Sequence, residues 1–278
     1  MNIKIVTDST ADLPPGAAEK LGITIVPEIL RFGDEIFRDN VDITPDEFYR
    51  RLTHDPIHPK TTQSSPQDFT DAYQALAPQA DAILSIHISA KLSGTYNSAV
   101  QGAKAVKCPI EVVDSQVVTM GLGQLVIAAS KLAESGMNLQ QAAAGVKKMI
   151  PGIRILGLLD TLKYLALGGR ISKAQALIGS ALNVKPLLTI KNGLLKPTSL
   201  VRSRVKGMDV LYNFAKNAPD IQDLAVIYNT QLEEAQDFVK RLGALYPEEK
   251  ITLSQLGPAL GVHTGPGILF VAVRSKTG

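Results

Sequence analysis

The sequence DAILSIHISAKLSGTYNSAV, residues 81–100, decides the fold because it predicts a buried strand, a polar turn and the start of a helix. Residues 82–86 are mostly apolar and partly β-branched, which is typical of a strand covered on both faces of a parallel sheet. Ser93 then favours the N-cap of a helix, and Gly94 lets the backbone approach a ligand. A helix that begins there points free N–H groups into a crevice that favours anions. A capped helix that binds nothing is the competing interpretation.

The order of strand, polar turn and helix recurs on both sides of this stretch. Residues 3–10 predict a strand followed by a polar turn, and residues 110–114 predict a strand before a long helix over 120–134. Residues 23–30 predict a further strand, which leads into a hairpin turn at Gly33-Asp34. This repetition indicates an α/β fold with a parallel sheet and helices on both faces.

A second α/β domain is predicted after Pro151-Gly152, which we take as the domain boundary. The two domains then cover residues 1–152 and 153–278, and the chain is long enough for both. Asn192-Gly193 predicts a β-hairpin turn in the second domain. A glycine-rich loop is expected over residues 261–267, before the last strand.

Composition excludes several classes of protein. Hydrophobic residues make up 45% of the chain, charged residues 20%, and no apolar run approaches the length of a membrane span. The net charge of +3 is small, and the basic residues are interleaved with acids, so nucleic acid is not an expected partner. The amino terminus enters a strand pattern without a secretory signal, and we therefore expect a cytoplasmic protein.

Neither a disulfide nor a metal site is predicted. Cys108 is the lone cysteine, which excludes an internal disulfide and a cysteine-based zinc site. His54 and His58 are four residues apart, but Pro56 between them breaks the helix that such a metal pair would need. We expect no metal and no cofactor.

The polar turns support a binding site better than a catalytic one. Thr61, Thr62, Ser93 and Thr95 offer hydroxyl donors, and His263 adds a ring nitrogen, a set suited to one carboxylate. Nucleophilic chemistry by Ser93 with His263 lacks the Gly-x-Ser-x-Gly elbow, and phosphoryl transfer lacks a phosphate-binding loop. A small-molecule hydrolase or transferase that uses Ser93 and His263 remains the alternative.

An ordered set of motifs along nearly the whole chain resembles the DegV family. These are Asp8-Ser9-Thr10, Lys60-Thr61-Thr62-Gln63, Leu92-Ser93-Gly94-Thr95-Tyr96, Val113-Asp114-Ser115, Leu167-Gly168-Gly169-Arg170 and His263-Thr264-Gly265-Pro266-Gly267. The resemblance implies two α/β domains with a fatty acid held between them. It also implies the role of a carrier without catalysis of its own, the acyl-binding subunit of bacterial fatty acid kinase. Such a subunit presents its bound fatty acid to a separate ATP-using kinase, which makes an acyl phosphate for phospholipid synthesis.

Site residues follow from the resemblance by position. Thr61 and Ser93 match the two residues expected to hold the carboxylate, and His263 matches a histidine expected beside it. We add Thr62, Gly94 and Thr95 to the expected head-group site. Arg170 and Arg202 match arginines expected near the entrance, where they would face the phosphate or the kinase. Thr62 and Ser64 depart from the family pattern, which puts the loop shape in doubt. Small residues over 174–181 could leave room for the acyl tail: Ala174, Ala176, Gly179, Ser180 and Ala181.

Overall fold

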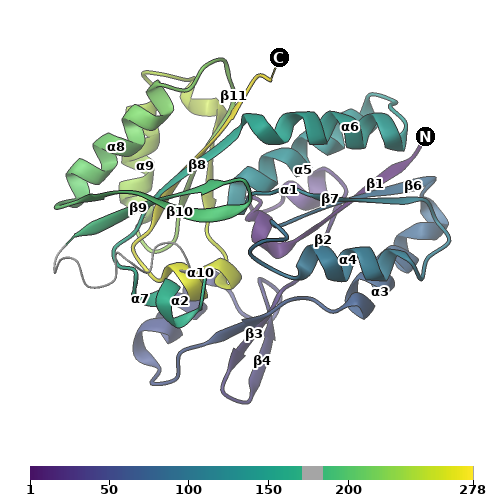
Figure 1. The fold of residues 1–278 in the computed structure, drawn as a ribbon, viewed down its shortest axis with the longest axis horizontal. Coiled ribbons are helices and arrows are strands. Elements are labelled where there is room, and N and C mark those ends of the chain that lie inside the picture. The colour runs from purple at the N-terminus through teal and green to yellow at the C-terminus, as the bar shows by residue number, and fades with distance from the viewer. Residues whose placement is uncertain (171–183, 278) are drawn as a thin grey trace.

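The structure is a computed structural model, and it describes residues 1–170 and 184–277. Its first sheet has four parallel strands in the order β2-β1-β6-β7 (Figure 1). All six residues of β6 are buried, because helices cover both faces of the sheet. The predicted parallel sheet flanked by helices is therefore confirmed. Its strands are β1 (Ile3–Asp8), β2 (Ile23–Val26), β6 (Ala82–His87) and β7 (Ile110–Asp114).

Two pairs of helices cover this sheet. One face packs against α5 and α6, and the other against α3 and α4. Capping boxes at Ser65 and Asn138 begin α3 and α6, because each side chain accepts an N–H of the first turn while the third helical residue reaches back. The bounds are α3 (Pro66–Leu76), α4 (Thr95–Ala103), α5 (Thr119–Glu134) and α6 (Leu139–Met149), with a short α1 (Ala17–Lys20) beside β2.

The second sheet has six strands in the order β10-β9-β8-β13-β11-β12. Neighbouring strands are antiparallel except for β11 and β12, which are parallel. The predicted hairpin is confirmed, with Asn192 and Gly193 both at positive φ between β9 and β10. Helices α8 (Arg204–Lys216) and α9 (Leu232–Leu242) cover the outer face. The strands are β8 (Ile153–Leu158), β9 (Lys185–Lys191), β10 (Leu194–Val201), β11 (Ile221–Tyr228), β12 (Ile251–Gln255) and β13 (Leu269–Ser275).

Helix α5 packs against both sheets and joins them. Gly121 permits this contact, since a Cβ there would lie 2.5 Å from Cδ1 of Ile155. Gly123 faces the other side, where a Cβ would lie 2.7 Å from the carbonyl oxygen of Ala11. One cluster of buried apolar side chains consequently includes residues of both sheets. The division into domains at residue 152 stays a prediction.

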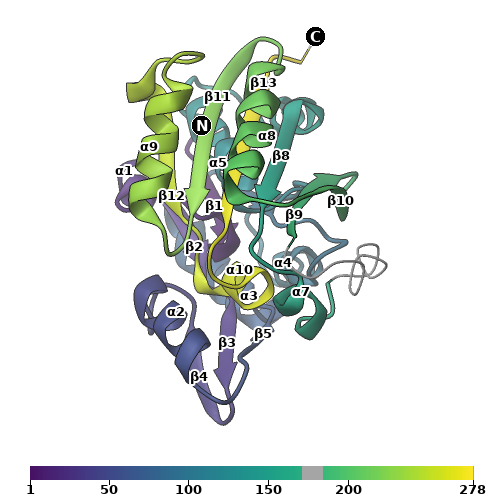
Figure 2. The same cartoon turned by 90° about the vertical axis from the view of Figure 1, so that its left-hand side faces the viewer.

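The strand predicted over residues 23–30 is wrong, because the chain changes sheets at Pro27. Strand β2 ends at Val26, and β3 (Ile29–Phe32) pairs instead with β4 (Glu35–Arg38) and β5 (Lys60–Thr62) in a small third sheet. Proline has no N–H for a ladder, and the N–H of Glu28 bonds to the side chain of Ser9. The third sheet projects from the molecule beside α2 (Pro45–His54), as Figure 2 shows.

The glycine-rich loop predicted over residues 261–267 is also partly wrong, since its first half is helical. Helix α10 (Pro258–Thr264) begins with a proline in its first turn and ends at Gly265, which has a φ of +72°. It contacts a second short helix, α7 (Lys163–Leu167), which follows β8. Short 3₁₀ helices span Ser9–Ala11, Ala77–Gln79, Ile150–Gly152 and Glu248–Lys250. None of the described helices is both long and apolar enough to cross a membrane.

Candidate functional site

A cavity lies where the carboxyl ends of the first sheet meet the inner face of the second. The space between its lining atoms, open mouth included, is about 880 Å³. Polar groups gather at one end: Thr10, Glu28, Thr61, Ser93, His263 and Thr264. Most of the remaining lining is apolar, and Thr189 within it donates its hydroxyl to the carbonyl of Ile155. The apolar side chains include Val118, Ile155, Leu188, Ile190, Leu195 and Phe270. The cavity is therefore amphipathic along its length.

Ser93 reaches the polar end from the turn before α4. The residue that caps this helix is Gly94, so the predicted N-cap at Ser93 is shifted by one position. Ser93 Oγ lies 2.7 Å from Thr95 Oγ1 and accepts the N–H of Thr95 at 3.3 Å. A Cβ at Gly94 would lie 2.0 Å from the side-chain oxygen of Gln63, so a larger residue would displace that side chain. The short turn thus brings two hydroxyl groups together.

Thr61 reaches the same end from β5, and its hydroxyl oxygen lies 3.0 Å from Nε2 of His263. Burial lowers the pKa of His263 to about 4, with further contributions from the charges of Arg170 and His58. The imidazole is consequently neutral at pH 7. If its hydrogen is on Nε2, His263 donates to Thr61, and the hydroxyl hydrogen of Thr61 is free for a ligand.

The segment after α10 fixes the position of His263. The side chain of Asn229 accepts the N–H groups of Gly267 and Ile268 at 3.0 and 3.1 Å, and donates to the carbonyl of Gly265 at 2.6 Å. Neither glycine has room for a side chain. A Cβ at Gly265 would lie 2.1 Å from the ring of Tyr164, and a Cβ at Gly267 would lie 2.2 Å from a carboxyl oxygen of Asp160. The glycines of the C-terminal motif therefore serve close packing behind the site.

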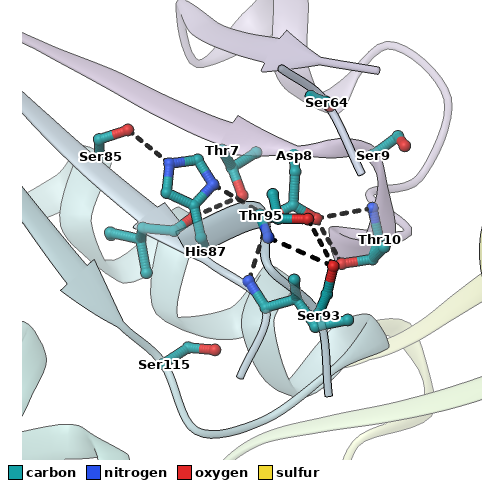
Figure 3. A network of polar contacts seen from close by, with 12 residues as sticks. Thr7, Asp8, Ser9, Thr10, Ser64, Ser85, His87, Ser93, Thr95 and Ser115 are labelled. Atoms are coloured by element: carbon teal, nitrogen blue, oxygen red, sulfur yellow. Dashed lines mark hydrogen bonds and ion pairs between the residues drawn. The ribbon is translucent and has the colours of Figure 1, made fainter. Parts of the chain in front are cut away.

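A buried chain of polar side chains supports the polar end, and Figure 3 shows its part from Thr10 through Asp8 and His87 to Ser85. Asp8 accepts the N–H of Thr10 at 3.1 Å and lies 3.0 Å from Nδ1 of His87. The other ring nitrogen of His87 lies 2.6 Å from Ser85 Oγ, which in turn lies 2.8 Å from the hydroxyl of Tyr73. Thr10 also donates its hydroxyl to Asp8. Sequence reasoning missed this chain, although a histidine within an otherwise buried strand was a usable signal.

Glu28 is the second group that sequence reasoning missed. It is 4% exposed, lines the cavity, and its carboxyl group lies 2.5 Å from the hydroxyl oxygen of Thr95. Burial raises its pKa to about 8, and the negative charge of Asp8 adds to the shift. Asp39 lies nearby, and burial raises its pKa to about 7. A protonated carboxyl group is therefore expected beside Thr95 at neutral pH.

The structure places the remaining predicted residues at different distances from the cavity. Thr62 is exposed and does not line it, because successive side chains of a strand point to opposite faces. Thr95 and Gly94 lie behind Ser93 and contribute through it. Arg170 lines the mouth, with a guanidinium N–H bonded to the carbonyl of Gly168 at 2.8 Å. Arg202 is exposed and away from the lining. The small residues proposed for the tail, 174–181, lie outside the described residues.

Arg204, two residues beyond Arg202, is held in ion pairs. Its guanidinium contacts Glu234 at 2.5 Å and Asp160 at 3.2 Å, and donates to the carbonyl of Gly267 at 2.6 Å. These contacts satisfy the charge within the protein. Arg204 is therefore unsuited to receive a phosphate.

The pair proposed for nucleophilic chemistry does not form a hydrogen bond. Ser93 bonds to Thr95, whereas Nε2 of His263 bonds to Thr61. Nδ1 of His263 has no partner within the described part of the chain, so no carboxylate orients the ring. In those same residues, no group of three or more potential ligands could hold a metal ion.

Comparison with known proteins gives consistent matches over the full length. The model of the DegV family, described as uncharacterised proteins, matches residues 2–276. A DegV domain-containing protein of Streptomyces coelicolor is 37% identical, with 99% of each chain covered. The crystal structure of DegV from Bacillus subtilis, described as a fatty acid binding protein, gives a TM-score of 0.91 at 30% identity, covering 99% of this chain and all of that one. A stearic acid-binding protein from Eubacterium ventriosum gives 0.88 at 30% identity, with 98% of both covered.

Proposed function

Because this chain belongs to the DegV family, we propose that it binds a long-chain fatty acid in the amphipathic cavity, with the carboxylate at Thr61 and Ser93. The observation that carries the proposal is the distribution of polarity. Hydroxyl groups and a neutral histidine gather at one end, and apolar side chains line the rest. A fatty acid has the same distribution.

The head group needs donors, since a carboxylate only accepts hydrogen bonds. Thr61 is backed by His263 and Ser93 by Thr95, so each hydroxyl can receive one hydrogen bond and donate another outward. A hydrogen bond to a charged group contributes about 1.5–3 kcal/mol. Two such bonds offset part of the desolvation of the carboxylate.

The acyl tail supplies most of the binding free energy. Burial of one methylene contributes about 0.8 kcal/mol, so fourteen contribute on the order of 11 kcal/mol before ordering costs. Phe270, Ile155 and Leu188 offer the apolar surface for this burial. Only the head group then remains available to another protein.

We further propose that the protein is a carrier without catalysis of its own. It would present the carboxylate to a separate ATP-dependent fatty acid kinase in the cytoplasm, and the acyl phosphate formed would enter phospholipid synthesis. Arg170 at the mouth and the exposed Arg202 are the cations proposed to face the phosphate or the kinase. The unpaired geometry of Ser93 and His263 disfavours the alternative of a hydrolase or transferase.

Native mass spectrometry of the purified protein tests the proposal. We expect one long-chain fatty acid per chain, released on denaturation and identified by its mass. A protein that is empty and binds no added fatty acid would contradict the proposal.

The carrier role needs a second assay, in which an ATP-dependent fatty acid kinase is added to the loaded protein. Arg202→Ala should slow phosphorylation of the bound fatty acid several-fold while leaving its affinity unchanged, because the residue lies outside the cavity. Arg38→Ala, an exposed arginine on β4 paired with Asp42, is the matched control.

A further inference from the structure

Three side chains form a continuous hydrogen-bonded chain that ends at the cavity. The carboxyl group of Glu28 bonds to Thr95 Oγ1 at 2.5 Å, and Thr95 Oγ1 lies 2.7 Å from Ser93 Oγ. Glu28 and Ser93 line the cavity, while Thr95 is fully buried between them. The direction in which hydrogens point along this chain decides what Ser93 can offer a ligand.

Consider first an ionised Glu28. A carboxylate only accepts, so Thr95 must give its single hydroxyl hydrogen to Glu28. Two hydroxyl oxygens 2.7 Å apart need one hydrogen between them, and it must then come from Ser93. Ser93 has no hydrogen left for the cavity. It would present only lone pairs to the ligand carboxylate, which are repulsive.

When Glu28 is protonated, the donor and acceptor exchange roles in each hydrogen bond of the chain. Its O–H donates to Thr95, Thr95 donates to Ser93, and the hydrogen of Ser93 is free to point into the cavity. The backbone N–H of Thr95, 3.3 Å from Ser93 Oγ, donates in the same direction. Ser93 then accepts two hydrogen bonds and can donate one to the ligand.

We propose that Glu28 is a positioning residue that keeps a proton and thereby orients the Thr95 and Ser93 hydroxyls toward the carboxylate of the bound ligand. The inference rests on the proposed function, because it needs a carboxylate at Ser93. It adds a residue to the site that touches the ligand only through two others. It also makes ligand binding depend on a proton held by the protein.

The surroundings of Glu28 favour the protonated form. Burial and the negative charges of Asp8 on β1 and Asp39 after β4 raise its pKa, and hydrogen bonds from Thr95 and from the backbone of Ser64 lower it by less. Within the described residues, Glu28 forms no salt bridge. Among the described residues that line the cavity, Arg170 carries a positive charge and is exposed, and His263 is neutral. Burial raises the pKa of Glu28 to about 8, and a bound carboxylate would raise it further.

The test is the affinity of the full-length protein for oleate between pH 6.5 and 9.5, a window in which the ligand stays ionised. We expect constant affinity up to about pH 8 and then a loss approaching tenfold per pH unit, since one proton is linked to binding. Glu28→Gln should bind oleate as tightly as wild type at pH 6.5, because its amide N–H replaces the carboxyl O–H. Its affinity should not fall at alkaline pH. Alkaline loss that persists in Glu28→Gln would overturn the inference.

Asp39→Asn is the matched control, a second buried acid that does not contact Thr95. Its affinity for oleate should still fall at alkaline pH. The fall should start at a lower pH than in wild type, because the charge of Asp39 helps to raise the pKa of Glu28. If Asp39→Asn abolishes the loss, Asp39 rather than Glu28 holds the relevant proton, and the inference fails.

Methyl oleate separates hydroxyl orientation from simple charge repulsion. Its carbonyl is an acceptor without charge. If hydroxyl orientation matters, the affinity for the ester should also fall above pH 8, by less than the affinity for oleate. This fall should be absent in Glu28→Gln. An ester whose affinity is independent of pH would show that repulsion alone acts, and would overturn the inference. Wild-type protein that binds no oleate at pH 6.5 would instead remove the proposed function itself. Tight binding of oleate by the wild type at every pH would contradict the role of Glu28 and leave the proposed function standing.

Discussion

The two sheets line one cavity with different parts of their strands. The parallel sheet contributes the turns that follow its strand ends, where Thr10 and Ser93 lie. The mixed sheet contributes the inner face of its strands, where Ile155, Leu188 and Phe270 point toward α5. Strand ends leave polar backbone and hydroxyl groups free, whereas a covered sheet face selects apolar side chains.

This difference predicts two kinds of sensitivity. Binding at the head depends on a few hydrogen bonds of defined direction, so removal of one hydroxyl should produce a large loss for every acyl chain. Binding at the tail depends on apolar area and volume, so a change there should affect long chains more than short ones. Substitutions at either end test this difference in sensitivity.

The largest effect is expected from removal of both head-group hydroxyls. The double variant Thr61→Val with Ser93→Ala should bind oleate about a hundredfold more weakly or worse, because two bonds to a charged group are lost. Displacement of a fluorescent fatty acid measures this, and decanoate and oleate should lose affinity by the same factor. An affinity within threefold of wild type would place the carboxylate elsewhere.

Matched controls separate that loss from general damage. Thr62→Val changes the next residue of the same strand, whose side chain is exposed, and Ser199→Ala removes an exposed hydroxyl on β10. Both should bind oleate like wild type. If Thr62→Val lost as much affinity for oleate as Thr61→Val, Thr62 would belong to the head-group site.

A smaller, length-dependent effect is expected from Gly157→Ala in the tail wall. The new Cβ would lie 2.1 Å from Cε1 of Phe270, so the ring must move within the cavity that both residues line. If the space for two methylenes is lost, the affinity for an 18-carbon acid should fall about tenfold more than the affinity for a 14-carbon acid. The ratio between the two lengths is an internal control for destabilisation. Equal losses at both lengths would contradict an acyl tail at Phe270.

Much of the fold was predictable from local patterns. The apolar run of β6 and the Asn192-Gly193 turn each carry a local signal that the structure confirms. The change of sheet at Pro27 was not predicted, because residues on both sides of it favour strand equally. The helix at Pro258 was not predicted, because the glycines at 261, 265 and 267 favour a loop, although a proline suits the first helical position.

The site was predictable where it depends on motifs and not where it depends on packing. Thr61, Ser93 and His263 were named from sequence, and all three line one cavity although they are far apart in the chain. Alternation along a strand could have separated Thr61 from Thr62. Glu28 had no local signal, since its pKa shift and its hydrogen bond involve Asp8 and Thr95, which are distant in sequence.

The most direct test of the central claim is the orientation of the ligand. A crystal structure with a fatty acid brominated at its terminal carbon, measured at the bromine absorption edge, would locate both ends at once. We predict the carboxylate within hydrogen-bonding distance of Thr61 and Ser93, and the bromine among the apolar side chains around Phe270. Bromine at the mouth beside Arg170, with the carboxylate elsewhere, would contradict the account.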